Sequence, residues 1–265
     1  MAHELSGHTR AAGVIGMPVR HSLSPAIFNA AFAASGLDWA YLAFEVPDGA
    51  AGLAMGGMRA LGLEGLSVTM PHKAAVIPAL DRLSADAEAL QAVNCVHREG
   101  AELVGHNTDG PGFVDALQID EGIDLAGRSV TVIGAGGAAR AVIRALAGAG
   151  ARSVVIFNRS ADTAEWAAAL APGVARVGQP ESVGETDLVV NATSSSTRGE
   201  PLALAPATFA PGALAYDMAY GAAAVPFLEA ARRAGARASD GVGMLVEQAA
   251  ESFFLWRGKR PDTAG

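Results

Sequence analysis

Residues 128–142 read RSVTVIGAGGAARAV, an apolar run that passes through glycines into an alanine-rich segment. The pattern predicts a buried strand, a tight turn and a helix in direct succession. Gly134 permits the turn out of the strand, and Gly136 lets the backbone approach a pyrophosphate. Ala139 is the small residue at which helix and strand pack closely. Because backbone N–H groups at a helix start bind phosphate, this stretch predicts a dinucleotide-binding unit.

The next apolar run indicates which dinucleotide is bound. Residues 153–157 form the second predicted strand, and Asn158, Arg159 and Ser160 follow it. An NAD enzyme usually has Asp or Glu here, bonded to the ribose 2′-hydroxyl. An arginine beside a hydroxyl instead suits a 2′-phosphate, because guanidinium donates charge-assisted hydrogen bonds. We therefore predict NADP, while the alternative that Arg159 is an ordinary solvated loop arginine stays open.

Composition restricts the class of protein. The chain has 265 residues, 51% hydrophobic and 17% charged, which is enough for one large or two modest domains. A formal net charge of −8 argues against a nucleic-acid partner. The single cysteine, Cys95, argues against an intrachain disulfide framework and fits a reducing compartment. With no apolar signal core and no apolar stretch of about 18 residues, we expect a cytoplasmic protein without a membrane partner.

Strands and helices alternate along the chain. The strands expected before the glycine stretch are 11–16, 39–46, 63–69, 93–97 and 102–106, with helices at 25–35 and 49–61 and helical patterning through 73–90. Those expected within and after it are 129–133, 153–157, 174–177, 187–191, 213–217 and 236–239. We therefore predict an α/β protein, in which an N-terminal α/β substrate domain with a mainly parallel sheet precedes a C-terminal Rossmann-type dinucleotide-binding domain.

The last predicted helix bears on the domain boundaries. Residues 243–257 are amphipathic and lie beyond the strands that the nucleotide sheet needs, so we expect this helix to pack on the first domain. The predicted domains are 1–110 with 240–265 for substrate binding and catalysis, and 111–239 for NADP. A connecting helix is expected over 110–115.

Three polar clusters follow predicted strands of the first domain. HSLSP at 21–25 offers two hydroxyls to a polyol or carboxylate ligand, although a serine there could equally cap a helix. SVTMPHK at 67–73 directs Ser67 and Thr69 the same way and places Lys73 just beyond. HNTDG at 106–110 contains Asp109, which could also be a helix cap.

The order of these motifs resembles the shikimate dehydrogenase family, which includes shikimate/quinate dehydrogenases. The resemblance covers residues 13–262 and rests on nine motifs in one order: HSLSP, SVTMPHK, AVN (92–94), HNTDG, GAGGAAR, NRS, NATS (191–194), YDMAY (216–220) and DGVGMLVEQAA (240–250). It implies NADP-dependent reduction of 3-dehydroshikimate to shikimate, with Lys73 and Asp109 as the catalytic pair. An ammonium beside the carbonyl stabilises an alkoxide and can donate a proton. A neighbouring carboxylate can hold the ammonium. Which of the two is the formal acid stays open.

The resemblance also assigns binding residues. The expected substrate contacts are Ser22, Ser24, Ser67, Thr69, Asn94, Tyr216 and Gln248. The expected cofactor contacts are Gly134, Gly136, Gly137, Ala138, Asn158, Arg159, Ser160, Thr193, Met218 and Gly241. No metal is expected. The expected partner is a small-molecule cyclic polyol acid, bound by a monomer or homodimer.

Departures from the family pattern leave the substrate open. Ser67 replaces the Asn that is usual in the shikimate-specific branch. Met70 favours the quinate/shikimate branch, whereas the Asn-Arg-Ser signature argues against it. A quinate/shikimate or related polyol-acid dehydrogenase is therefore the alternative. A non-catalytic nucleotide-sensing protein is a third, opposed by the presence of both Lys73 and Asp109.

Overall fold

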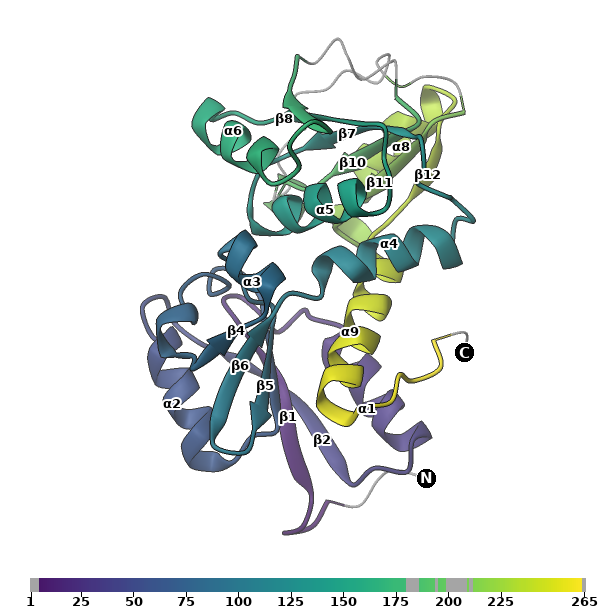
Figure 1. The fold of residues 1–265 in the computed structure, drawn as a ribbon. Coiled ribbons are helices and arrows are strands. Elements are labelled where there is room, and N and C mark those ends of the chain that lie inside the picture. Colours follow the sequence, from purple (N-terminus) through teal and green to yellow (C-terminus); the bar gives the residue numbers. More distant parts are fainter. Residues whose placement is uncertain (1–4, 180–185, 194, 199–208, 210–211, 264–265) are drawn as a thin grey trace. The chain divides into compact units, whose positions relative to one another are not determined.

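The chain forms two compact units in the computed structural model, which describes residues 5–179, 186–193, 195–198, 209 and 212–263 (Figure 1). Unit 1 comprises Met1–Thr108 and Val246–Gly265, and unit 2 comprises Asp109–Leu245. The expected boundaries lie two residues from the first division and six from the second. The larger difference arises because the second division falls inside one continuous helix, α9 (Val242–Arg257), where no break in pattern marks it.

Unit 1 is built on a mixed sheet of strand order β2-β1-β3-β5-β6-β4. The strands are β1 (Arg10–Gly16), β2 (Trp39–Glu45), β3 (Gly65–Val68), β4 (Arg82–Leu83), β5 (Cys95–Glu99) and β6 (Glu102–His106). Three described pairings, β1–β2, β1–β3 and β4–β6, are parallel. The β3–β5 and β5–β6 pairings are antiparallel. The second is a hairpin, in which Gly100, at φ +65°, turns β5 directly back into β6.

Helices cover both faces of this sheet. Helix α1 (Ser24–Ala34) and the unit 1 part of α9 bury Phe28, Phe32, Phe253 and Trp256 against one face. Helices α2 (Ala51–Leu61) and α3 (Ala85–Leu90) cover the other face. This packing of α9 is the arrangement expected for the last helix.

The helical patterning expected through 73–90 is wrong as a single helix. The segment forms turns, a 3-10 helix at Ile77–Ala79, the short strand β4 and then α3. Pro78 lacks an N–H and cannot continue an α-helix from the residues before it. Asp81 accepts a hydrogen bond from the backbone N–H of Leu103 at 2.7 Å, which fastens the segment beside β6. Ser84 then caps α3 by accepting from Ala87 N–H at 3.3 Å.

Unit 2 has a sheet of strand order β12-β11-β10-β7-β8-β9, and every pairing among these strands is parallel. The strands are β7 (Ser129–Ile133), β8 (Ser153–Phe157), β9 (Ala175–Val177), β10 (Leu188–Asn191), β11 (Leu214–Asp217) and β12 (Arg237–Ser239). Chain order runs outward from β7 in one direction and from β10 in the other. This doubly wound order confirms the predicted Rossmann-type domain and places the switch point between β7 and β10.

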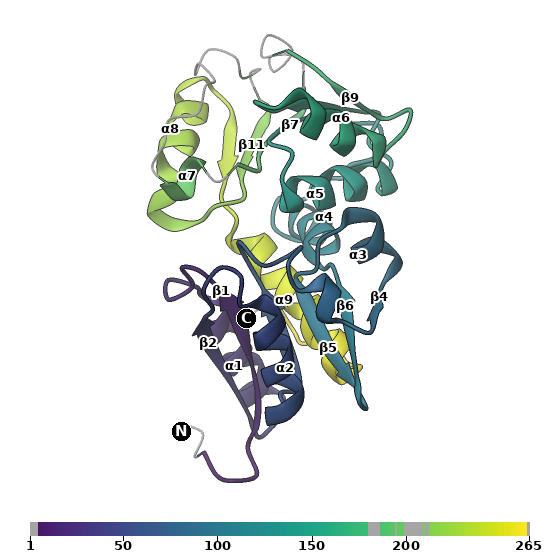
Figure 2. The same ribbon diagram turned by 90° about the vertical axis from the view of Figure 1, so that its left-hand side faces the viewer.

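Helices also cover both faces of this second sheet (Figure 2). Helices α4 (Asp109–Ile119), α5 (Gly137–Gly148) and α6 (Ala161–Ala169) share one hydrophobic core with the sheet. Helix α8 (Val225–Arg233) packs on the opposite face, and α7 (Ser195–Arg198) is a short helix after β10. No helix in the described part of the chain combines the length and apolarity needed to span a bilayer.

Candidate functional site

The predicted substrate residues of unit 1 lie largely at one edge of its sheet. Thr69 follows the carboxyl end of β3, and Asn94 precedes β5, which runs antiparallel to it. The backbone N–H of Val68 donates to the Asn94 carbonyl at 2.7 Å, so these two ends are in direct contact. Strand β6 ends at this edge as well, because the Asn94 N–H donates to the carbonyl of His106 at 3.0 Å.

The HSLSP segment enters α1 with both serine side chains engaged. The Ser22 hydroxyl donates to the Ser24 hydroxyl at 3.1 Å, and the Ser24 N–H donates to Ser22 Oγ at 3.2 Å. Leu23 occupies the cap position of α1 and its side chain makes no capping bond, so neither serine is the N-cap residue itself; Ser22 Oγ nevertheless accepts the N–H of the first helical residue, Ser24. The Met17 N–H donates to the Met70 carbonyl at 3.0 Å, which ties this loop to the one that carries Lys73.

The backbone around Lys73 is held by its neighbours. The His72 N–H donates to the Thr69 carbonyl at 2.9 Å, and the fully buried His72 ring places Nε2 2.8 Å from the Val46 carbonyl. The Lys73 carbonyl accepts from Val93 N–H at 2.8 Å. A half-buried lysine on so constrained a turn is positioned by the fold rather than free on the surface.

Asn94 is held in a buried hydrogen-bond network that the sequence did not reveal. Its amide Nδ2 donates to Thr108 Oγ1 at 3.0 Å, and its Oδ1 accepts the Thr108 N–H at 2.7 Å. Thr108 Oγ1 lies 3.2 Å from Ser252 Oγ on α9, and the Ser252 hydroxyl donates to the Gln248 carbonyl at 2.9 Å. This network, hereafter the Asn94–Thr108–Ser252 network, fixes the Asn94 side chain in unit 1 and includes the backbone carbonyl of Gln248.

Three further predicted residues are buried. Ser67 is 7% exposed, and its buried hydroxyl lies near that of Tyr41 without a well-formed hydrogen bond between them. Asp109 is 6% exposed and is the first residue of α4. Tyr216 is 1% exposed, packs edge-on against Phe113 and accepts the Met244 N–H at 3.2 Å; burial raises the pKa of its phenol. Their predicted contacts with a substrate stay predictions.

In unit 2 the glycine stretch forms the turn that its sequence predicts. Gly134 follows β7 with φ +109°, and a Cβ there would lie 2.9 Å from the Ala192 carbonyl oxygen, so only glycine fits between β7 and β10. Gly136 is the N-cap of α5, and a Cβ there would meet open space. The first N–H groups of α5, from Gly137 and Ala138 onward, have no partner within the helix and point out of its N-terminus, where helices bind phosphate. The arrangement fits a pyrophosphate.

The end of β8 provides the second part of this region. Ser160 caps α6, accepting from Thr163 N–H at 3.5 Å and from the Thr163 hydroxyl at 3.0 Å. The Asn158 amide donates to the Ser160 carbonyl at 3.0 Å. Arg159 between them is exposed and forms no ion pair with any described residue. Its guanidinium is therefore available to an anion at the strand end that a dinucleotide's ribose reaches in such folds.

A buried carboxylate, not predicted from sequence, organises the next two strand ends. Asp217 is 0% exposed and accepts from the Asn191 amide at 2.9 Å, the Ser196 hydroxyl at 2.8 Å and the Ala219 N–H at 2.9 Å. Burial raises the pKa of this carboxyl, against the lowering effect of those bonds. Asn191 Oδ1 accepts from both the N–H and the hydroxyl of Thr193, at 3.2 and 2.8 Å. The sequence did contain a sign of this pair, because the apolar strands LVVN and LAYD each end in a polar residue, Asn191 and Asp217.

The remaining cofactor residues lie at this same edge. The Met218 N–H donates to the Asn191 carbonyl at 3.0 Å, and the Gly241 N–H donates to the Ala219 carbonyl at 2.9 Å. A Cβ at Gly241 would lie 2.7 Å from the Met218 carbonyl carbon. The structure thus brings the predicted cofactor residues together at the carboxyl edge of one sheet. Ser194, in the NATS motif, lies outside the described residues.

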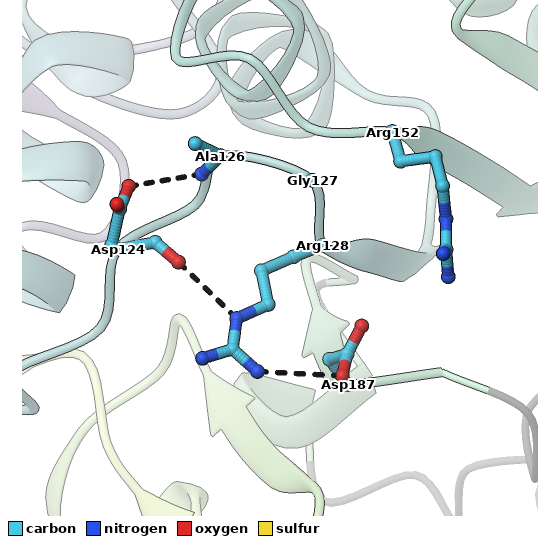
Figure 3. Close-up of a pocket in the computed structure, with 6 residues that line it drawn as sticks. All are labelled: Asp124, Ala126, Gly127, Arg128, Arg152 and Asp187. Carbon is cyan, nitrogen blue, oxygen red and sulfur yellow. Dashed lines mark hydrogen bonds and ion pairs between the residues drawn. The ribbon is translucent and has the colours of Figure 1, made fainter.

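A different pocket, of about 360 Å³, lies at the opposite, amino edge of the unit 2 sheet (Figure 3). Its arginines are already engaged: Arg128 lies 3.5 Å from Asp187, and Arg152 donates to Ser129 Oγ at 2.6 Å. Ligands of open parallel sheets bind outside the carboxyl ends of the strands. This pocket is therefore not the candidate nucleotide site.

Family profiles and known proteins match most of the chain. Three family profiles match: Shikimate dehydrogenase substrate binding domain over residues 14–96, Shikimate / quinate 5-dehydrogenase over 116–199, and Shikimate 5′-dehydrogenase C-terminal domain over 241–265. The chain is 44% identical over 268 residues to Shikimate dehydrogenase (NADP(+)) of Geobacter sulfurreducens, covering 97% of this chain and 94% of the relative.

Two solved structures agree with that match. Shikimate dehydrogenase from Aquifex aeolicus has a TM-score of 0.90 at 34% identity, covering 98% of this chain and 96% of the other. Shikimate 5-dehydrogenase from Thermus thermophilus, in complex with NADP(H) and shikimate, has a TM-score of 0.85 at 35% identity, covering 96% and 95%. With this identity along nearly its full length, the chain belongs to the shikimate dehydrogenase family.

Proposed function

We propose that this chain catalyses the reversible, NADP-dependent reduction of 3-dehydroshikimate to shikimate, with Lys73 and Asp109 as its catalytic pair. The observation that carries the proposal is the position of Lys73. In a chain of this family, it sits half-buried on a turn held by hydrogen bonds, at the sheet edge that also bears Thr69 and Asn94.

The cofactor is assigned to the carboxyl edge of the unit 2 sheet. The turn and α5 start formed by Gly134, Gly136, Gly137 and Ala138 would hold the pyrophosphate, and Asn158, Arg159 and Ser160 the adenosine phosphate. Thr193, Met218 and Gly241 would lie near the ribose and nicotinamide. When bound, the reduced nicotinamide supplies a hydride. The buried Asp217–Asn191 pair supports this assignment because it orients Thr193 through two hydrogen bonds.

The substrate is assigned to the polar edge of unit 1. Ser22 and Ser24 would bind the carboxylate, and Thr69, Asn94 and Gln248 the ring hydroxyls, with Tyr216 and Ser67 as further contacts. The Lys73 ammonium would stabilise the alkoxide that forms at the carbonyl oxygen and donate a proton to it. Asp109 would hold the ammonium and bind a hydroxyl.

Lys73→Ala tests the catalytic assignment directly. We expect kcat for shikimate oxidation to fall ~10²–10⁴-fold, with NADP affinity nearly unchanged, because general acid–base catalysis contributes that much. Lys259→Ala is the matched control, since Lys259 is the other lysine of the chain and is exposed. Turnover of Lys73→Ala equal to that of Lys259→Ala would remove Lys73 from the mechanism.

Arg159→Ala tests the nucleotide assignment. Loss of the guanidinium should raise KM for NADP at least tenfold and leave KM for NAD nearly unchanged, because only NADP carries the 2′-phosphate. Arg232→Ala, which removes an exposed arginine of α8, is the control. An equal effect of Arg159→Ala on both nucleotides would contradict a role at the 2′-phosphate.

A quinate/shikimate dehydrogenase is the second candidate, and Ser67 favours it. Serine is shorter than the usual asparagine, which leaves room for an additional substrate group. The buried Ser67 hydroxyl makes no well-formed bond with that of Tyr41. Rates for shikimate and quinate, each with NADP and NAD, discriminate the two. Ser67→Asn should raise the ratio of kcat/KM for shikimate to that for quinate, and an unchanged ratio would remove the argument.

We further propose that the enzyme acts in the cytoplasm as a monomer or homodimer. The support for a reducing compartment is Cys95, which is buried and carries a free thiol. Light scattering on the eluting protein should give the chain mass of 26.7 kDa or twice that value; a larger mass would contradict the proposed assembly.

A further inference from the structure

Strands β5 and β6 form a hairpin in unit 1 (Figure 1). Three of its residues, His97, Glu99 and His106, carry metal-binding donors that lie close together. His97 and Glu99 are two residues apart on β5, so their side chains project to the same side. The antiparallel register pairs His97 with Val104 and Cys95 with His106, which places His106 diagonally across from His97 on that side. One donor atom from each of the three residues lies within 4.8 Å of the others.

We propose that this hairpin binds one Zn²⁺ ion through His97, Glu99 and His106. Two imidazoles and one carboxylate form a donor set that proteins use for zinc, with a fourth position open to water. Nothing in the proposed dehydrogenase function requires such an ion, so the site is independent of that function.

The distances suit binding after a small adjustment. Zinc bonds to imidazole and carboxylate of about 2.1 Å put tetrahedral donors about 3.4 Å apart. His97 Nδ1 already lies 3.6 Å from Glu99 Oε1. Because every donor separation is within 4.8 Å, none must close by more than about 1.4 Å. Glu99 can supply this movement because its side chain is 46% exposed.

His106 adds an observation that points to a ligand. Its Nε2 is buried and has no hydrogen-bond partner in the described part of the chain. A buried polar atom without a partner costs free energy, and a metal bond would remove that cost. A zinc ion bound here would give this nitrogen a partner.

The neighbouring charges permit a cation. Arg82 donates to Glu99 Oε2, but it also donates to Glu102 Oε2 at 2.7 Å, so a second carboxylate balances the guanidinium. Glu99 Oε1 remains the oxygen that faces His97. The two carboxylates and one guanidinium leave a net negative charge beside the imidazoles.

Binding at this place would link β5 and β6 across the hairpin. The His106 carbonyl accepts the Asn94 N–H at 3.0 Å, and the chain continues from His106 into Thr108 of the Asn94–Thr108–Ser252 network. Zinc that binds only the folded hairpin should therefore raise the thermal midpoint of the protein.

Calorimetric titration of tag-free, chelator-treated protein with zinc chloride at pH 7.5 tests the proposal, since imidazoles are then mostly neutral. We expect one saturable site per chain and a raised thermal midpoint in the presence of zinc. His97→Gln and Glu99→Gln should each weaken affinity at least tenfold and abolish the thermal shift, while His8→Gln, which changes an exposed histidine, leaves both intact.

Two outcomes would overturn the proposal. One is the absence of saturable zinc binding. The other is equal zinc affinity in His97→Gln, Glu99→Gln and the parent, which would show that the three side chains form a surface charge cluster only. A further variant, His106→Gln, should also lose zinc binding, and retention of parental affinity by it would equally contradict the site.

Discussion

Removing the hydroxyl of Thr108 should lower the free energy of unfolding of unit 1, because that hydroxyl makes two buried hydrogen-bond contacts. Thr108→Val keeps the branched shape of the side chain, which is 2% exposed, and leaves the backbone bond from Thr108 N–H to Asn94 in place. It removes the contacts of Oγ1 with Asn94 Nδ2 at 3.0 Å and with Ser252 Oγ at 3.2 Å. At about 1 kcal/mol for each bond, the free energy of unfolding should fall by about 2 kcal/mol.

Thr131→Val is a closely matched control. Thr131 is 0% exposed in unit 2, and its hydroxyl has no hydrogen-bond partner among the described residues. Replacing that hydroxyl by a methyl group therefore loses no bond and removes a polar group buried without compensation. The free energy of unfolding should stay unchanged or rise by about 1 kcal/mol. The same chemical change at similar burial should thus destabilise the protein at Thr108 but not at Thr131.

Differential scanning calorimetry measures both effects, and can report separate transitions if the two units unfold separately. A loss of about 2 kcal/mol corresponds to a thermal midpoint lower by roughly 4–8 °C in a domain of 150–250 residues and by more in a smaller one. In kinetics, Thr108→Val should raise KM for shikimate more than it lowers kcat, because Asn94 loses part of its support. A Thr108→Val midpoint within about 1 °C of the parent, or an equal fall in Thr131→Val, would show that the Thr108 hydroxyl does not stabilise unit 1.

Two further perturbations test the packing and the buried charge. Gly65→Ala should lower the free energy of unfolding by about 1–3 kcal/mol, because the added Cβ would lie 2.6 Å from Trp256 Cδ2; Gly56→Ala on α2, where nothing lies within 4 Å, should raise it by about 0.5–1 kcal/mol. Urea unfolding measures both free energies. Destabilisation by Gly56→Ala, or unchanged stability in Gly65→Ala, would contradict the corresponding prediction. Burial raises the folded-state pKa of Asp217, so the folded protein favours the protonated carboxyl. The resulting contribution to the free energy of unfolding is fully present below the unfolded pKa of about 3.9 and is lost as pH rises through the folded pKa. The stability of the parent minus that of Asp217→Asn should therefore decrease over that interval; an increase would show that the carboxyl is not strained by burial.

The sequence predicted unit 2 more closely than unit 1, for a physical reason. Buried parallel strands are continuous apolar runs, and β7 and β8 begin and end where those runs do. In unit 1 the pattern through 73–90 suggested one helix, because alanines and leucines recur there at helical spacing. Pro78 and the bond from Leu103 N–H to Asp81 decided otherwise. The second of these joins strands far apart in the chain, and no local pattern contains it.

The family, the fold class and the NADP-type strand end at Arg159 can be inferred from the amino-acid sequence, since these depend on local chemistry and on motif order. The contacts that hold those residues in place depend on how distant segments pack together. The contact of Thr108 with Ser252 joins positions 144 residues apart, and it exists because α9 packs on the unit 1 sheet. The proximity of His97 to His106, and of Asn191 to Asp217, likewise depends on strand register, because the pairing of each strand with its neighbour decides which residues lie side by side.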